Sequence, residues 1–67
     1  MDMDLKGFLM WHKGNADGYV TTDSGRDLTG RELRAYCRWG VSNGYELLSE
    51  LPEFEEVEQR MKEEGFL

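Results

Sequence analysis

The chain has few of the residues that form cross-links or metal sites. Its 67 residues include one cysteine, Cys37, and one histidine, His12. An internal disulfide needs two cysteines, and a structural zinc site is normally a quartet of Cys and His ligands, so the sequence excludes both. We expect no metal and no cofactor, and a buried free thiol suited to a reducing compartment.

Long hydrophobic runs are also missing. The longest apolar stretch is Phe8–Trp11, whereas a membrane-spanning helix needs about 20 apolar residues. No signal-peptide pattern is present either. We therefore expect a cytoplasmic protein that makes no contact with membranes.

Basic residues are outnumbered. Eight Lys and Arg stand against 14 Asp and Glu, giving a formal net charge of −6. Residues 1–40 hold six acidic and six basic side chains, so the whole acidic excess lies after Gly40. Because polyanion binding depends on surplus Lys and Arg, this balance makes nucleic acid an unfavourable but not excluded partner.

No arrangement of residues indicates catalysis. His12 and Cys37 could form a nucleophilic pair, but the sequence indicates no third residue to orient them, so a packed thiol and a surface imidazole is the simpler interpretation. Phosphate-binding glycine motifs are absent. We expect that the protein is not an enzyme.

What is present is enough for one folded unit, a single small domain over residues 1–67. Hydrophobic residues make up 39% of the chain, and eight are aromatic. A chain of this length buries about 60% of its unfolded surface. There is room for one core and no deep pocket.

The clearest local signals mark a helix over residues 29–40. Thr29 and Glu32 have capping-box spacing, and Gly40 predicts a stop in the left-handed conformation. Leu33, Tyr36 and Cys37 share one face of this helix, while Arg31, Arg34 and Arg38 share another. We expect the first face to be buried and the second to be exposed.

Two further helices follow in the prediction. Ser42 or Asn43 can cap a second helix that ends near Leu51. Pro52 suits the first position of a third helix, which would end at Glu64 before a glycine stop at Gly65. This third helix would carry most of the acidic excess.

Residues 28–51 resemble the helix-turn-helix of small DNA-binding regulators. The resemblance rests on Leu28-Thr29, Glu32-Leu33, Gly40-Val41-Ser42 and the following Tyr45, Leu47 and Leu48. It implies a nucleic-acid-binding regulator whose phosphate contacts come from Arg26, Arg31, Arg34 and Arg38. The second helix has no Lys or Arg, which departs from the pattern, so this function is kept as the alternative.

Before the helices, the sequence predicts a β-hairpin. Residues 6–13 are rich in aromatics and bounded by glycines, residues 14–18 have turn composition, and residues 19–22 are β-prone. The predicted fold class is therefore α+β, with an N-terminal two-stranded antiparallel β-hairpin packed on three short α-helices. Both faces of the first strand are largely apolar, so one could remain exposed for another chain or a second copy, unless the C-terminal helix covers it.

These features favour a non-enzymatic module that binds a protein partner, either a basic surface or a second copy, as a small regulator or inhibitor. Small acidic proteins of phages and mobile elements are similar in size and charge. The candidate partner-binding residues are Phe8, Trp11, Tyr19, Glu53, Glu55, Glu56 and Glu63. The simpler alternative is that the acidic residues form only a solvated face.

Overall fold

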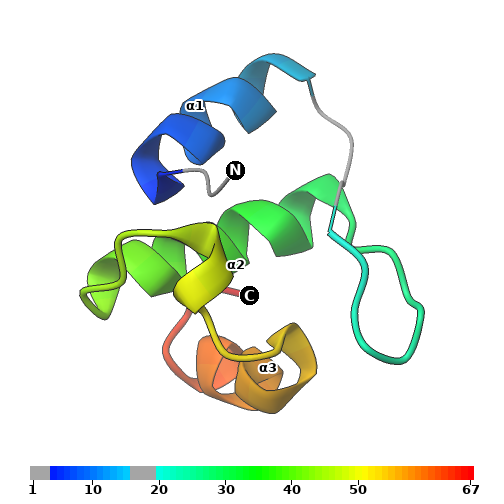
Figure 1. The fold of residues 1–67 in the computed structure, drawn as a ribbon. Coiled ribbons are helices and arrows are strands. Elements are labelled where there is room, and N and C mark those ends of the chain that lie inside the picture. Colours follow the sequence, from blue (N-terminus) through cyan, green and yellow to red (C-terminus); the bar gives the residue numbers. More distant parts are fainter. Residues whose placement is uncertain (1–3, 16–19) are drawn as a thin grey trace.

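Three α-helices make up the structure, a computed structural model that describes residues 4–15 and 20–67. They are α1 (Leu5–Asn15), α2 (Gly30–Ser42) and α3 (Phe54–Glu63), with a short 3-10 turn, η1 (Leu48–Glu50), between α2 and α3. In Figure 1, α2 lies between α1 on one side and α3 on the other. None of these three helices, within the described ranges, is long and apolar enough to cross a membrane.

The predicted β-hairpin is wrong. Residues 6–13 belong to helix α1, and the described part of the chain contains two isolated β-bridges but no strand. A strand would alternate with a period of two, whereas Leu5, Phe8 and His12 are buried at helical spacing. Because one face of a helix can satisfy all three, tertiary packing overrides the strand propensity.

Helices α1 and α2 run antiparallel. Near the start of α1, Leu5 lies against Gly40 late in α2. Near the end of α1, the ring Nε2 of His12 lies 3.2 Å from the carbonyl oxygen of Gly30 at the start of α2. The two contacts fix which parts of the helices face each other.

The core is formed by one side of each helix. Helix α2 buries both aromatic and aliphatic side chains because its apolar residues face α1 and α3 together. The largest fully buried side chains are Phe54, Leu5, Leu33, Met61, His12 and Cys37. The predicted apolar face of residues 29–40 is confirmed, since Leu33, Tyr36 and Cys37 are all buried.

The predicted start of α2 is confirmed, but its end is not. Thr29 accepts a hydrogen bond from the Glu32 N–H, and the Glu32 carboxylate accepts one from the Thr29 N–H, which completes the capping box. The helix continues through Gly40 and ends two residues later. The left-handed residue is Gly44, with φ of 86°, and the Tyr45 N–H donates to the Gly40 carbonyl in a Schellman motif.

The second predicted helix is also wrong. After Gly44 the chain is extended, and it pairs with the start of α1: the Leu5 N–H donates to the Glu46 carbonyl at 3.0 Å. Only η1 is helical in residues 43–51. The Glu50 carboxylate accepts from the N–H groups of Glu46 and Leu47, which stabilises this turn.

The third helix is confirmed with slightly shorter bounds. Glu53, not Pro52, precedes its first turn, and the helix ends at Glu63. Gly65 has φ of 86°, and the Phe66 N–H donates to the Met61 carbonyl at 2.8 Å. The predicted glycine stop at Gly65 is therefore present.

Candidate functional site

A pocket of about 240 Å³ lies between α1 and α2 and is the candidate site. Its lining combines two apolar side chains with three cationic ones: Leu9, Met10, Lys6, Arg34 and Arg38. Leu9 and Arg34 are half-buried, whereas the other three are exposed. We call this feature the α1–α2 pocket.

The two walls of the α1–α2 pocket come from helical stripes. Lys6 and Met10 are one turn apart on α1, and Arg34 and Arg38 are one turn apart on α2. Because the helices are antiparallel, Lys6 lies toward the end that holds Arg38, and Met10 lies toward the end that holds Arg34. Two cations are therefore near one end of the pocket and one cation near the other.

Among the described residues, the cations of the α1–α2 pocket have no acidic partner. Within the described residues, the ion pairs involve Arg26 and Lys62 as the basic members, and neither Lys6, Arg34 nor Arg38 takes part in one. Lys6 also borders a second hollow lined in part by Asp4 and Glu46. The positive charge is thus compensated least at the two arginines.

Met10 is the most exposed large apolar side chain in the described structure, with 76% of its surface accessible. Trp11 is 40% exposed and packs against Phe8, with ring centroids 5.5 Å apart. At about 100° per residue, Trp11 lies about 160° around α1 from Leu9. The pocket and Trp11 therefore occupy opposite flanks of the helix.

The predicted aromatic anchors are separated by the fold. Phe8 is only 6% exposed and belongs to the core, so it cannot contact a partner without unfolding. Trp11 remains partly accessible. Tyr19 lies outside the described residues.

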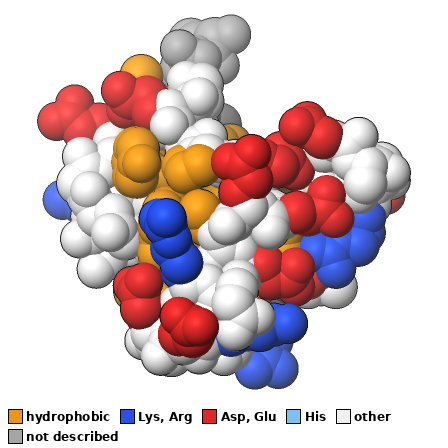
Figure 2. Space-filling model, turned by 90° about the horizontal axis from the view of Figure 1, so that it is seen from below, with side chains coloured by type: hydrophobic (Ala, Val, Ile, Leu, Met, Phe, Trp, Pro, Cys, Tyr) orange, Lys and Arg blue, Asp and Glu red, His pale blue; other side chains and the backbone are white. Residues whose placement is uncertain are grey.

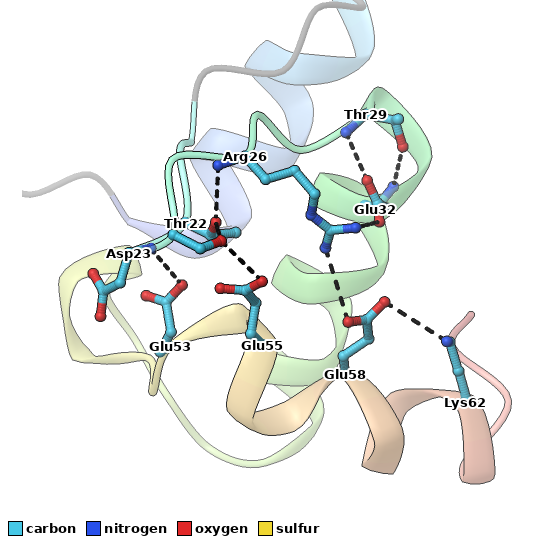
Figure 3. Close-up of polar contacts among 10 residues, drawn as sticks. Thr22, Asp23, Arg26, Thr29, Glu32, Glu53, Glu55, Glu58 and Lys62 are labelled. Carbon is cyan, nitrogen blue, oxygen red and sulfur yellow. Dashed lines mark hydrogen bonds and ion pairs between the residues drawn. The ribbon is translucent and has the colours of Figure 1, made fainter.

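Two of the predicted partner-binding acids are engaged within the fold. Glu53 accepts a hydrogen bond from the Asp23 N–H at 3.0 Å, and Glu55 accepts one from the Ser24 hydroxyl at 3.1 Å (Figure 3). Both contacts tie the 20–29 loop to the start of α3. These carboxylates have a structural role whether or not they also meet a partner.

Arg26 is the centre of the same network. Its guanidinium lies 3.4 Å from a Glu32 carboxylate oxygen and 3.8 Å from one of Glu58 (Figure 3). It also stands over the Phe54 ring, 5.4 Å from the ring centroid. Arg26 is therefore committed to α2 and α3 side chains. Ion pairing distinguishes Arg26 from Arg31, Arg34 and Arg38. Arg31 borders the same hollow as Glu32 and Glu58, whereas Arg34 and Arg38 line the α1–α2 pocket.

The remaining predicted acids are on the surface. Glu56 and Glu63 are exposed on α3, where Glu63 accepts only a long contact from Gln59. Figure 2, which views the molecule from below, shows acidic side chains over much of this face with Lys and Arg among them. The exposed acids of α3 therefore lie on a surface where basic side chains are interspersed.

Cys37 and His12 are both fully buried. Burial raises the pKa of the Cys37 thiol from 9.0 to about 12, which disfavours the reactive thiolate. His12 places Nε2 near the Gly30 carbonyl, while Nδ1 has no hydrogen-bond partner. The predicted surface imidazole is therefore wrong. No cluster of three or more His, Cys, Asp or Glu suited to a metal occurs in the described residues.

Sequence reasoning did not identify three of the pocket residues, Lys6, Leu9 and Met10, as a site. The signal was present, since residues 6 and 10 are one turn apart if the segment is helical. Assigning the segment to a strand placed Lys6 and Met10 on the hairpin instead.

Comparisons with protein-family models, with curated proteins and with solved structures gave no match to this chain.

Proposed function

We propose that this chain is a non-enzymatic protein-binding module of the cytoplasm whose contact surface is the exposed side of α1 together with the α1–α2 pocket. The observation that carries the proposal is the exposure of Met10 beside that pocket. Methionine is enriched at protein interfaces because its flexible, polarisable side chain adapts to different partners. A regulator or inhibitor of this size would act by occupying a surface of its partner.

The proposed location of the contact differs from the acidic residues that the sequence favours, Glu53, Glu55, Glu56 and Glu63. Glu53 and Glu55 are used to hold the 20–29 loop, and Glu58 pairs with Arg26 and Lys62. A partner that claimed these carboxylates would have to displace contacts within the fold. A partner that binds the cationic residues of the α1–α2 pocket would break no ion pair among the described residues.

Photo-crosslinking tests the proposed surface. Met10 would be replaced by photoreactive p-benzoyl-phenylalanine in the producing cell, with Gln59, an exposed residue of α3, replaced in the same way as the matched control. We expect a discrete protein adduct from position 10 and none of that mass from position 59. An adduct of twice the chain mass would identify a homodimer. Equal adducts from both positions, or none, would contradict the proposal.

Nucleic-acid binding is a second candidate, because the exposed Arg31 and Arg38 and the half-buried Arg34 of α2 form no ion pairs in the described structure. The helix that would read bases is missing, so only phosphate contacts remain. Titration with duplex DNA at low salt tests it. This candidate requires binding that weakens steeply with salt and falls when the three arginines are changed to glutamine.

A further inference from the structure

We infer that the α1–α2 pocket binds an acidic segment of a partner protein, with one large apolar side chain in the pocket and carboxylates against Lys6, Arg34 and Arg38. This inference rests on the proposed function, because it names the chemistry that the same surface recognises. Four properties of the pocket support it: its size, the spacing of its cations, their lack of partners, and the distribution of charge over the molecule.

The size of the pocket fits one side chain. Its volume of about 240 Å³ is below the range of about 300–1,000 Å³ that is usual for small-molecule sites. An apolar cavity of about 150 Å³ can accommodate a benzene-sized group. A phenylalanine, leucine or methionine side chain between Leu9 and Met10 would therefore fill the apolar part.

The spacing of the cations fits carboxylates on a peptide. Arg34 and Arg38 are one helical turn apart, so their Cβ atoms are separated by about 5–6 Å. Acidic residues one turn apart on a partner helix have the same spacing, and alternate residues of an extended segment are separated by about 7 Å. Arginine also binds carboxylates in a planar, two-pronged geometry that favours this pairing.

The pairing of charges within the chain leaves these cations available. Of the described basic residues, Arg26 and Lys62 pair with Glu32 and Glu58. Arg34 is half-buried and lines the pocket together with the exposed Arg38. An incoming carboxylate therefore gains a cation without breaking an existing pair.

The charge distribution favours a short acidic segment over a nucleic acid. The acidic excess lies after Gly40, and the molecule measures 26 × 26 × 20 Å, which exceeds a Debye length of about 8 Å at physiological salt. A short segment can stay at the cations of the pocket, where acids more than a Debye length away are screened. Asp4 and Glu46 border the hollow beside Lys6, so the positive charge is least opposed at Arg34 and Arg38. A polyphosphate chain would continue past three cations onto acidic surface and would not use the apolar lining.

The test uses the full chain and fluorescent peptides in which one phenylalanine, leucine or methionine is flanked on each side by three Asp or Glu. One control peptide replaces the apolar residue with serine, and another replaces the acids with Asn and Gln. A duplex DNA of 12 base pairs serves as the polyanion control. Binding is measured by fluorescence anisotropy at 50 mM NaCl and again at 500 mM NaCl.

Two charge-matched variants locate the site. Arg34→Gln with Arg38→Gln removes the cations of the pocket, whereas Arg31→Gln with Arg60→Gln removes two exposed arginines outside it. We expect the first variant to weaken peptide binding at least about tenfold and the second to change it less than about threefold. Circular dichroism confirms that both are folded. The serine control peptide and the high-salt condition should each weaken binding about tenfold.

The outcomes separate the inference from the proposed function. Absence of binding by all the acidic peptides, equal loss in both variants, or DNA binding stronger than peptide binding would overturn the inference. If position 10 still gives a specific protein adduct in the crosslinking experiment, the proposed function stands with a partner of different chemistry. If no adduct forms, both fail.

Discussion

Leu51 packs over the backbone of Gly40. A Cβ atom at position 40 would lie 2.5 Å from Cδ2 of Leu51 and 3.2 Å from Cδ1 of Leu5. Glycine at position 40 lets Leu51, which follows η1, and Leu5 of α1 both approach the last turns of α2. The contact joins three elements at a single residue.

We therefore expect Gly40→Ala to destabilise the domain by about 1–2 kcal/mol, because overpacking exceeds the gain of nearly 1 kcal/mol in helix propensity. Urea denaturation measures the change in the free energy of unfolding. Leu51→Ala, which removes the clashing atoms, should reduce the cost of Gly40→Ala in the double variant. A Gly40→Ala protein more stable than the native chain would show that Leu51 moves aside freely.

Gly40 also shows how far the sequence could predict the fold. The capping box at Thr29 and Glu32 and the glycine stop at Gly65 are local signals and were predicted correctly. Gly40 and Gly44 are both compatible with a helix stop, but in the structure Gly44 takes the left-handed conformation, while Gly40 stays in the helix and is approached by Leu51. That approach depends on packing between distant segments, which local patterns do not contain.

The same reasoning explains the error at α1. Phe8 to Trp11 is an apolar run too short to show its period, so strand propensity and helix packing could not be separated. The candidate site could not be predicted for the same reason, because the α1–α2 pocket exists only if Lys6 and Met10 lie on one helical stripe. The arginine half of the pocket was predictable, since the α2 signals were clear.

The Arg26 network should contribute modestly to stability. Arg26→Ala removes two ion pairs and the contact with the Phe54 ring, so we expect a loss of about 1 kcal/mol. Arg26→Lys should recover part of this loss. The measurement is urea denaturation at 50 mM and 500 mM NaCl, and the loss should shrink at high salt. An effect that ignores salt would assign the role of Arg26 to packing over Phe54 alone.

Alkaline pH should destabilise the fold through Tyr36 and Cys37. Burial, followed by the charge of Glu53, raises the pKa of Tyr36 from 10.0 to about 12, and burial raises the pKa of Cys37 from 9.0 to about 12. The Tyr36 hydroxyl also donates to the Pro52 carbonyl. Because the unfolded chain loses these protons first, the stability that they contribute is present below pH 9 and falls as pH rises toward 12.

Above its unfolded pKa, each group can lower the free energy of unfolding by at most about 1.4 kcal/mol per pH unit. Urea denaturation at fixed pH values from 7 to 11 measures this dependence. Tyr36→Phe with Cys37→Ala should be less stable at pH 7 but should lose less stability than the native chain between pH 9 and 11. Parallel curves for the two proteins would contradict the assignment.

Cys37 should react with thiol reagents only when the domain opens. Its side chain is fully buried, and its raised pKa keeps it protonated at neutral pH. The rate of modification by a disulfide reagent should therefore rise with urea in parallel with the unfolded fraction. A cysteine-containing short peptide provides the unprotected reference rate. Reaction at that reference rate in buffer alone would mean that the thiol is accessible in the native state.

Phe8 and Met10 should respond in opposite ways to truncation, although they are two residues apart on α1. Phe8 is buried against His12 and Trp11, so Phe8→Ala should cost about 3–5 kcal/mol, which is comparable to the whole stability of a domain of this size. Met10 is mostly exposed, so Met10→Ala should change stability by less than about 0.5 kcal/mol. Thermal unfolding followed by circular dichroism distinguishes the two. If Met10→Ala were as damaging as Phe8→Ala, Met10 would belong to the core, and the surface proposed here for partner binding would not exist.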